Sequence, residues 1–240
     1  MGPPPVTGPA FYARTGSRAG DLLTLLHLPY TAWHLSYAAI GAALAPALDG
    51  WRLAGTLAAF ALGLGIGAHA LDELHGRPLG TGISSPALTV LGWGGLAAGA
   101  ALAVAGAFVV HPLALAWGAA GVVLAAAYCL EWSRHLHSLA GFGLAWGAFP
   151  VLVGYWAQAE SVSWAAAGVA AAATVFAMTQ RVLSTPARHV RRRAADASAL
   201  VGTETWDRAR LLATWEVPLR LLAAAHVLLA AGLLLTHLDR

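Results

Sequence analysis

The sequence contains few residues that ionise and almost none that could form a covalent cross-link. Charged residues make up 10% of its 240 residues and hydrophobic residues 58%, a balance far from that of soluble globular proteins. Lysine is absent, so all fourteen basic residues are arginines. The single cysteine, Cys129, excludes an internal disulfide and a metal site built from thiolates. Together with a mean hydropathy of +0.65, these absences indicate a polytopic membrane protein.

Seven apolar stretches follow one another along the chain. Each is close to the ~20 residues that a helix needs to cross a bilayer. The stretches are 22–48, 53–71, 86–110, 112–130, 138–158, 163–183 and 217–237. We therefore predict an all-α fold, a polytopic transmembrane helical bundle with about seven spans. Residues 1–21 are predicted to be a flexible N-terminal tail, and residues 22–240 a single transmembrane domain.

The arginines are distributed unevenly between the two sides that this threading predicts. One side comprises 1–21, 72–85, 131–137 and 184–216. With the adjoining span ends it carries twelve of the fourteen arginines, whereas the other side carries Arg52 and Arg240. The positive-inside rule then places the arginine-rich side and the N-terminus in the cytoplasm and the C-terminus outside an inner (cytoplasmic) membrane. Anionic lipid headgroups are expected partners, and no nucleic acid is expected.

The longest polar connection, 184–216, combines a helix breaker with a cluster of positive charge. Pro186 is expected to end the preceding helix. The three consecutive arginines at 191–193 are followed by residues 194–215, which we predict to form an amphipathic helix on the cytoplasmic membrane surface.

The polar motif with the most ionisable residues lies at the end of the second apolar stretch. On a helix, His69, Asp72 and Glu73 share one face, and His75 could join them if the helix continues. An imidazole and two carboxylates form a suitable ligand set for a divalent cation. The alternative is a polar helix end that is stopped by the glycine and proline that follow. Because four ionisable groups are costly at a bilayer boundary, the motif favours a metal or phosphate function.

Two histidines of the first apolar stretch form a second candidate site. His27 and His34 are two turns apart, so a continuous helix would place them on one face. A lone histidine inside a membrane is usually a hydrogen-bonded packing residue. Because two lie on one face beside the span that contains His69, the ligand and packing interpretations both stay open.

Three arginines are candidates for binding phosphate, since a guanidinium can pair with a phosphate through two hydrogen bonds. Arg134 follows the fourth apolar stretch, close to Tyr128. Arg181 and Arg188 are seven residues apart and would face one way if their helix extended beyond the membrane. The orientation of the chain in the membrane explains an arginine-rich connection equally well.

These motifs together resemble the UbiA superfamily of intramembrane prenyltransferases over about residues 22–183. Leu26 to Tyr30 is similar to the first helix of that family. His69 to Leu79, continued by Gly82 to Ser84, is similar to its first Asp-rich motif, and Tyr128 to Arg134 to its central helix pair. The resemblance implies an all-helical bundle with a cytoplasm-facing cavity, in which magnesium holds a prenyl diphosphate while an acceptor is alkylated.

The resemblance assigns roles to the candidate residues and makes a membrane lipid or prenyl diphosphate the expected ligand. Catalytic roles fall to His69, Asp72 and Glu73. Substrate binding falls to Arg77, Tyr128, Arg134, Arg181 and Arg188. Apart from the resemblance, the histidine and carboxylate motifs themselves make His27, His34, His69, Asp72, Glu73 and His75 the candidate ligands of a divalent metal, which would be iron, copper or zinc in a metalloenzyme of oxidative type.

The chain also departs from the family pattern, and two alternatives stay open. His69 stands where the family's motif has asparagine, and no carboxylate follows in residues 179–195. Carboxylate oxygens suit magnesium, whereas imidazole suits iron, copper or zinc. One alternative is therefore a metal-dependent membrane oxidoreductase with histidine and carboxylate ligands. The other is a non-enzymatic membrane subunit that binds a lipid headgroup.

Overall fold

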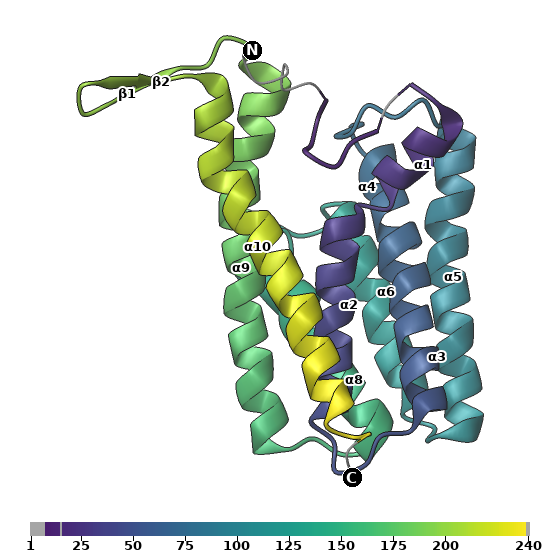
Figure 1. Ribbon diagram of the computed structural model, residues 1–240. Helices are drawn as coiled ribbons and strands as arrows, with labels where there is room; N and C mark the ends of the chain where they lie inside the picture. The colour runs from purple at the N-terminus through teal and green to yellow at the C-terminus, as the bar shows by residue number, and fades with distance from the viewer. Residues whose placement is uncertain (1–7, 15, 239–240) are drawn as a thin grey trace.

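The computed structural model describes residues 8–14 and 16–238, and its helices pack side by side into one bundle (Figure 1). Two segments, η1 and η2, are π-helical turns inside longer helices. The elements are α1 (Arg18–Leu25), α2 (Leu28–Ala43), α3 (Gly50–Phe60), η1 (Ala61–Ala68), α4 (His69–Leu74), α5 (Ser85–Val109), α6 (Ala114–Cys129), α7 (Leu139–Gly143), η2 (Leu144–Ala148), α8 (Phe149–Ala159), α9 (Trp164–Arg193), β1 (Ala199–Val201), β2 (Glu204–Trp206) and α10 (Arg208–Leu235).

Five helices in the described residues are long and apolar enough to cross a membrane, which agrees with an all-α integral membrane protein. They are 50–74, 85–109, 139–159, 164–193 and 208–235. The predicted spans 22–48 and 112–130 correspond instead to α2 and α6, which have 16 residues each. The predicted number of seven spans is therefore not confirmed.

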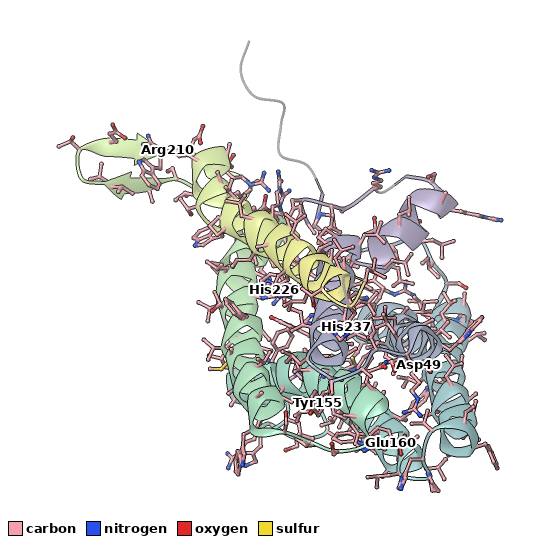
Figure 2. All side chains as sticks on the ribbon, turned by 60° about the horizontal axis from the view of Figure 1, so that its bottom comes forward. Asp49, Tyr155, Glu160, Arg210, His226 and His237 are labelled. Atoms are coloured by element: carbon pink, nitrogen blue, oxygen red, sulfur yellow. The ribbon has the colours of Figure 1, made fainter. Side chains whose placement is uncertain are left out.

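The two ends of the bundle differ in character. We call the end that carries α1, the loops 75–84 and 130–138, and the β1–β2 hairpin the polar end. The other end carries the loops 44–49, 110–113 and 160–163, and we call it the opposite end. Figure 1 shows the polar end at the top, with the C-terminus at the bottom. In Figure 2 the opposite end comes forward, with Asp49 and Glu160 labelled.

Helix α2 lies in the middle of the bundle, packed against α8 and α10. A Cβ atom on Gly41 of α2 would overlap the carbonyl oxygen of Val151, and one on Gly154 of α8 would overlap that of Ala38. These glycines let the two backbones approach closely, as small residues do between membrane helices.

The first predicted span, 22–48, is not one helix. His27 has a left-handed backbone conformation (φ 45°) and separates α1 from α2, and α1 lies at an angle to α2 (Figure 1). Helix α1 already begins at Arg18, where Ser17 accepts a hydrogen bond from Gly20 N. The boundary predicted at residue 21 therefore falls inside a helix, and residues 1–7 and 15 of the predicted tail lie outside the described residues.

The predictions for the connection 184–216 were wrong in two respects. Helix α9 continues through Pro186 to Arg193, and near its end the buried Arg191 guanidinium forms two hydrogen bonds to the Glu216 carboxylate, which hold this end of α9 against α10. In place of a surface helix over 194–215, the chain forms an antiparallel hairpin in which Val201 pairs with Glu204. Gly202 has the positive φ (62°) that a two-residue hairpin turn requires.

Candidate functional site

Six polar side chains from separate parts of the sequence lie together at the polar end, and we call them the polar-end cluster. They come from the N-terminal segment, the junction of α1 and α2, α4, and the end of α9. The members are Tyr12, His27, His69, Asp72, Arg188 and Arg192. Three of them, His27, His69 and Asp72, were predicted as metal ligands from the sequence.

The cluster is centred on two stacked imidazoles. The rings of His27 and His69 have centroids 4.1 Å apart and planes 25° apart. Nδ1 of His69 lies 3.1 Å from the carbonyl oxygen of Gly65, which can only accept, so His69 donates there through Nδ1. Nε2 of His27 is buried and has no hydrogen-bond partner among the described residues. The imidazole of His27 therefore has a buried ring nitrogen that forms no hydrogen bond within the described residues.

Asp72 differs from its neighbour Glu73 because its carboxyl group forms no hydrogen bond to another residue in the described part of the chain. The positive charges of Arg188 and Arg192 act on its carboxyl group from α9. These two arginines are four residues apart on a continuous helix, so they share one face. Asp72 therefore lies within the electrostatic influence of two guanidiniums, an arrangement that can bind a phosphate together with its counter-ion.

Tyr12 closes the cluster from the N-terminal side. Its ring lies 5.3 Å from that of His27 and 5.5 Å from that of Tyr30, centroid to centroid. Burial, together with the nearby Tyr30, raises the pKa of the Tyr12 phenol above its ordinary value. The phenol is therefore neutral and retains a proton that it can donate to a bound oxygen.

His34 lies deeper in the bundle than the stacked pair. Its ring is buried, and Nδ1 donates to the carbonyl oxygen of Trp146 in η2 over 2.8 Å. The prediction that His27 and His34 share a helix face was wrong, because His27 precedes α2 and has a left-handed backbone conformation. The contact with Trp146 gives His34 a packing role that joins α2 to η2.

Glu73, predicted as a catalytic and metal-binding residue, holds a loop in place. Its side chain is fully buried. Oε2 accepts a hydrogen bond from Leu79 N (2.8 Å), and Oε1 accepts from both N and Oγ1 of Thr81 (2.8 and 2.9 Å). These three donors fold the loop 75–84 back over the end of α4.

Arg77, predicted to bind substrate, stabilises the same loop. Its guanidinium donates to the carbonyl oxygen of Ile83 (2.5 Å) and to Oγ of Ser85 (2.7 Å). Its own backbone is left-handed (φ 54°), a conformation that a non-glycine residue adopts at a cost. The hydrogen bonds tie the loop to the start of α5.

Arg181 and Tyr128 contact each other rather than an open surface. Nη1 of Arg181 donates to the Tyr128 hydroxyl (2.6 Å) and to the Ser138 carbonyl oxygen (2.8 Å). The Tyr128 ring stacks on His137 with centroids 4.6 Å apart. Arg181 therefore connects α9 to the loop 130–138.

The remaining predicted residues are exposed at the polar end. Arg134 and His75 make no side-chain hydrogen bond to any residue in the described ranges. Arg188 is also exposed and lies 3.5 Å from the Thr185 hydroxyl, measured from Nη2. Of these three residues, only Arg188 belongs to the polar-end cluster.

Two members of the cluster were not assigned a role from the sequence. Arg188 and Arg192 are four residues apart, a spacing that puts two side chains on one face of a helix. Because the helix was expected to end at Pro186, this spacing was not interpreted in that way. Tyr12 falls in the predicted tail, where no periodic pattern indicates a contact. Only the packing of the N-terminal segment on α2 brings it to the site.

The six predicted metal ligands are not gathered into one site. Among residues 8–14 and 16–238, no group of three or more His, Cys, Asp or Glu side chains is placed to hold a metal ion. Glu73 is fully engaged, His34 contacts Trp146, and His75 is exposed. A metal at this position would need oxygens from a bound substrate in addition to Asp72.

Comparison of the chain with protein-family models, with curated proteins and with solved structures finds no match. The resemblance to the UbiA superfamily therefore rests on the sequence motifs.

Proposed function

We propose that the chain is a membrane-embedded enzyme of the prenyltransferase type, which binds a lipid with a phosphate or diphosphate headgroup at the polar-end cluster. The observation that carries this proposal is the stacked pair of His27 and His69, with Asp72 close enough to Arg188 and Arg192 for their charges to act on it. Guanidiniums suit phosphate because of their planar, multiple donors, and a helical transmembrane protein gives them direct access to lipid.

A lateral groove supports a lipid as the ligand. It has a volume of about 490 Å³ and lies between the N-terminal segment, α2 and α10. Its lining is apolar apart from Arg220, whose guanidinium lies 4.6 Å from the centre of the Phe11 ring. Phe11 in turn contacts Tyr12 and Tyr30. A hydrocarbon chain in this groove would place its headgroup near the cluster.

Asp72 is the residue that would hold a divalent cation in this enzyme. Magnesium is commonly bound by one or two carboxylates together with the phosphates of a substrate, so one free carboxylate is compatible with such a site. When bound, the ion would neutralise charge on the diphosphate. Iron, copper or zinc would need several imidazoles around one point, and the histidines here do not provide them.

The residues of the cluster have distinct roles in this proposal. Arg188 and Arg192 stabilise the negative charge that develops on the diphosphate as the bond between the prenyl carbon and oxygen breaks. Tyr12 donates a hydrogen bond to the same group. The prenyl carbon forms its new bond to the acceptor, and Nε2 of His27, which has no partner, accepts the proton that the acceptor loses.

The proposed orientation follows from the arginines. Twelve of the fourteen lie on the side predicted from the sequence to be cytoplasmic, and the loops of that side form the polar end. We therefore place the polar end in the cytoplasm, the N-terminus with it, and the C-terminus outside an inner membrane.

A second candidate function is a non-enzymatic lipid-binding subunit. Glu73, Arg77 and Arg181 are engaged in structural hydrogen bonds, which leaves fewer groups for chemistry than the sequence predicts. Binding and turnover measured separately distinguish the two functions.

The proposal is tested with purified protein in detergent and radiolabelled geranylgeranyl diphosphate, with and without magnesium. Arg188→Gln and Arg192→Gln are expected to weaken binding roughly tenfold or more, the effect of losing a charged hydrogen bond of about 1.5–3 kcal/mol. Arg134→Gln, an exposed arginine of the same end, is the matched control and should bind normally. Equal binding by all three variants would contradict the assignment of the site.

Release of inorganic diphosphate then separates an enzyme from a binding protein. Release that depends on an added acceptor and is lost in Asp72→Asn supports the transferase. Binding without any release supports the non-enzymatic subunit.

A further inference from the structure

A second, larger cavity lies in the opposite half of the bundle. Its volume is about 580 Å³, within the ~300–1,000 Å³ range of small-molecule sites. It is lined by α3, η1, α5, α6, η2 and α8, and most of its wall is carbon. Residues of the wall include Ala59, Leu96, Leu102, Val122, Phe149 and Val153. No sequence motif pointed to this cavity.

Two glycines of the wall face open space. A Cβ atom on Gly55 or Gly63 would meet no heavy atom within 4 Å. Gly67 and Gly95 differ from them, because a Cβ there would press on the backbone of the facing helix. Glycine is unfavourable inside a helix unless something requires it. Close helix packing explains the glycines at positions 67 and 95, whereas the glycines at positions 55 and 63 enlarge the cavity.

One polar atom of the wall has no partner. Nε1 of Trp117 is buried and makes no hydrogen bond to any residue in the described ranges. Its ring is held between Phe149 and Trp156, with centroids 5.9 and 6.0 Å away. A buried N–H without an acceptor is costly, so an oxygen atom of a ligand in the cavity would relieve that cost.

The cavity mouth lies at the level of a membrane interface. Trp51 and Trp164 of the opposite end are 89% and 94% exposed, and tryptophan side chains at span ends mark the headgroup level of a bilayer. Arg52 lines the mouth and forms an ion pair with Glu160 at 2.8 Å. Trp117 is in the first turn of α6, close to this level.

The floor of the cavity separates it from the polar-end cluster. Leu64, Ala145 and Trp146 line the deep end. On the side that faces the polar end, the carbonyl oxygen of Trp146 accepts a hydrogen bond from His34, and the Trp146 ring contacts the Tyr128 ring. A ligand here is therefore distinct from one bound at the polar-end cluster.

We propose that this cavity binds one hydrocarbon chain of a lipid from the leaflet at the opposite end, and that an ester or hydroxyl oxygen of this lipid accepts a hydrogen bond from Trp117. The apolar wall and the space at Gly55 and Gly63 fit the chain. The N–H of Trp117 lies at the depth where a lipid changes from hydrocarbon to oxygen. This assignment is independent of the function proposed for the polar-end cluster.

The test uses the full chain in lipid nanodiscs that contain a monoacylglycerol with a photoactivatable diazirine in its acyl chain. After irradiation, mass spectrometry is expected to find the probe on peptides of η1 and α6. Gly63→Leu and Gly55→Leu, which fill the cavity at two independent points, should each abolish this labelling. Gly168→Leu is the matched control, because a side chain there also meets open space but Gly168 does not line the cavity.

The polar contact is tested by Trp117→Phe, which removes the N–H and keeps an aromatic ring. Labelling by the monoacylglycerol is expected to fall roughly two- to tenfold, the effect of one neutral hydrogen bond, whereas labelling by a diazirine alkane should not change. Equal monoacylglycerol labelling would overturn the role of Trp117. Equal labelling of Gly63→Leu, Gly55→Leu and the control would overturn the lipid site.

Discussion

The imidazole rings of His27 and His69 lie stacked, with their centroids 4.1 Å apart. The contact joins two breaks in helical geometry: His27 interrupts the chain between α1 and α2, and His69 follows the π-helical η1. Irregular backbone at membrane depth is tolerated where it is buried in protein or lines a cavity, and π-helical turns are frequent at functional sites. The stack therefore places the candidate site where both helices depart from regular structure.

Replacement of Glu73 by alanine is expected to destabilise the protein strongly. The change leaves three donors of Leu79 and Thr81 without their acceptor, and each unsatisfied buried group costs about 1–3 kcal/mol. Thermal unfolding in detergent should show a clear fall in Tm. Asp72→Ala, which removes the adjacent carboxylate but no hydrogen bond between described residues, should unfold near the wild-type temperature. Similar Tm values for the two variants would contradict the structural role of Glu73.

Replacement of Glu216 by alanine is expected to cost about 3–5 kcal/mol, because it removes the carboxylate that a buried arginine faces. The side chains of Arg191 and Glu216 are 5% and 7% exposed. The pair formed by Arg210 and Glu204, at 53% and 62%, provides the control: Glu204→Ala should cost less than about 1 kcal/mol. Denaturant unfolding of both variants measures the difference, and equal costs would refute the prediction.

Replacement of Gly41 by alanine should separate α2 from α8. The added methyl group would overlap the backbone of Val151, which cannot move without shifting α8, so overpacking of about 1–3 kcal/mol or more is expected. Gly168→Ala adds the same group in open space and should leave stability unchanged or slightly raised. Tm values compared in one detergent decide the matter, and an unaffected Gly41→Ala protein would show that the helices are not tightly packed there.

The membrane orientation is tested with single cysteines in a Cys129→Ala background. Ser198→Cys, beside the hairpin, should resist an impermeant thiol reagent added outside intact cells, whereas Thr236→Cys at the other end should react. Both positions are exposed, so accessibility to solvent does not limit the reaction. Labelling of Ser198→Cys from outside would reverse the proposed topology.

The sequence predicted where several helices of the bundle begin to within a residue. The stretches 86–110, 138–158 and 163–183 begin within one residue of α5, α7 and α9. Each of these helices starts after a serine whose side chain accepts a hydrogen bond from the first turn. Long apolar runs between polar caps are local signals, and a membrane helix satisfies its backbone hydrogen bonds within its own segment. The same reasoning placed the arginine-rich loops together.

Only the tertiary structure decided which polar residues are available for binding. His69, Asp72, Glu73, Arg77 and Arg181 look alike in the sequence as ionisable groups at span ends. Folding gives Glu73 and the two arginines hydrogen-bond partners in loops, and it brings Tyr12 and Arg192 to Asp72 instead. Local periodicity determines that a segment is helical and where it ends. The partner of a buried charge depends on contacts between distant segments, which no periodic pattern in one sequence encodes.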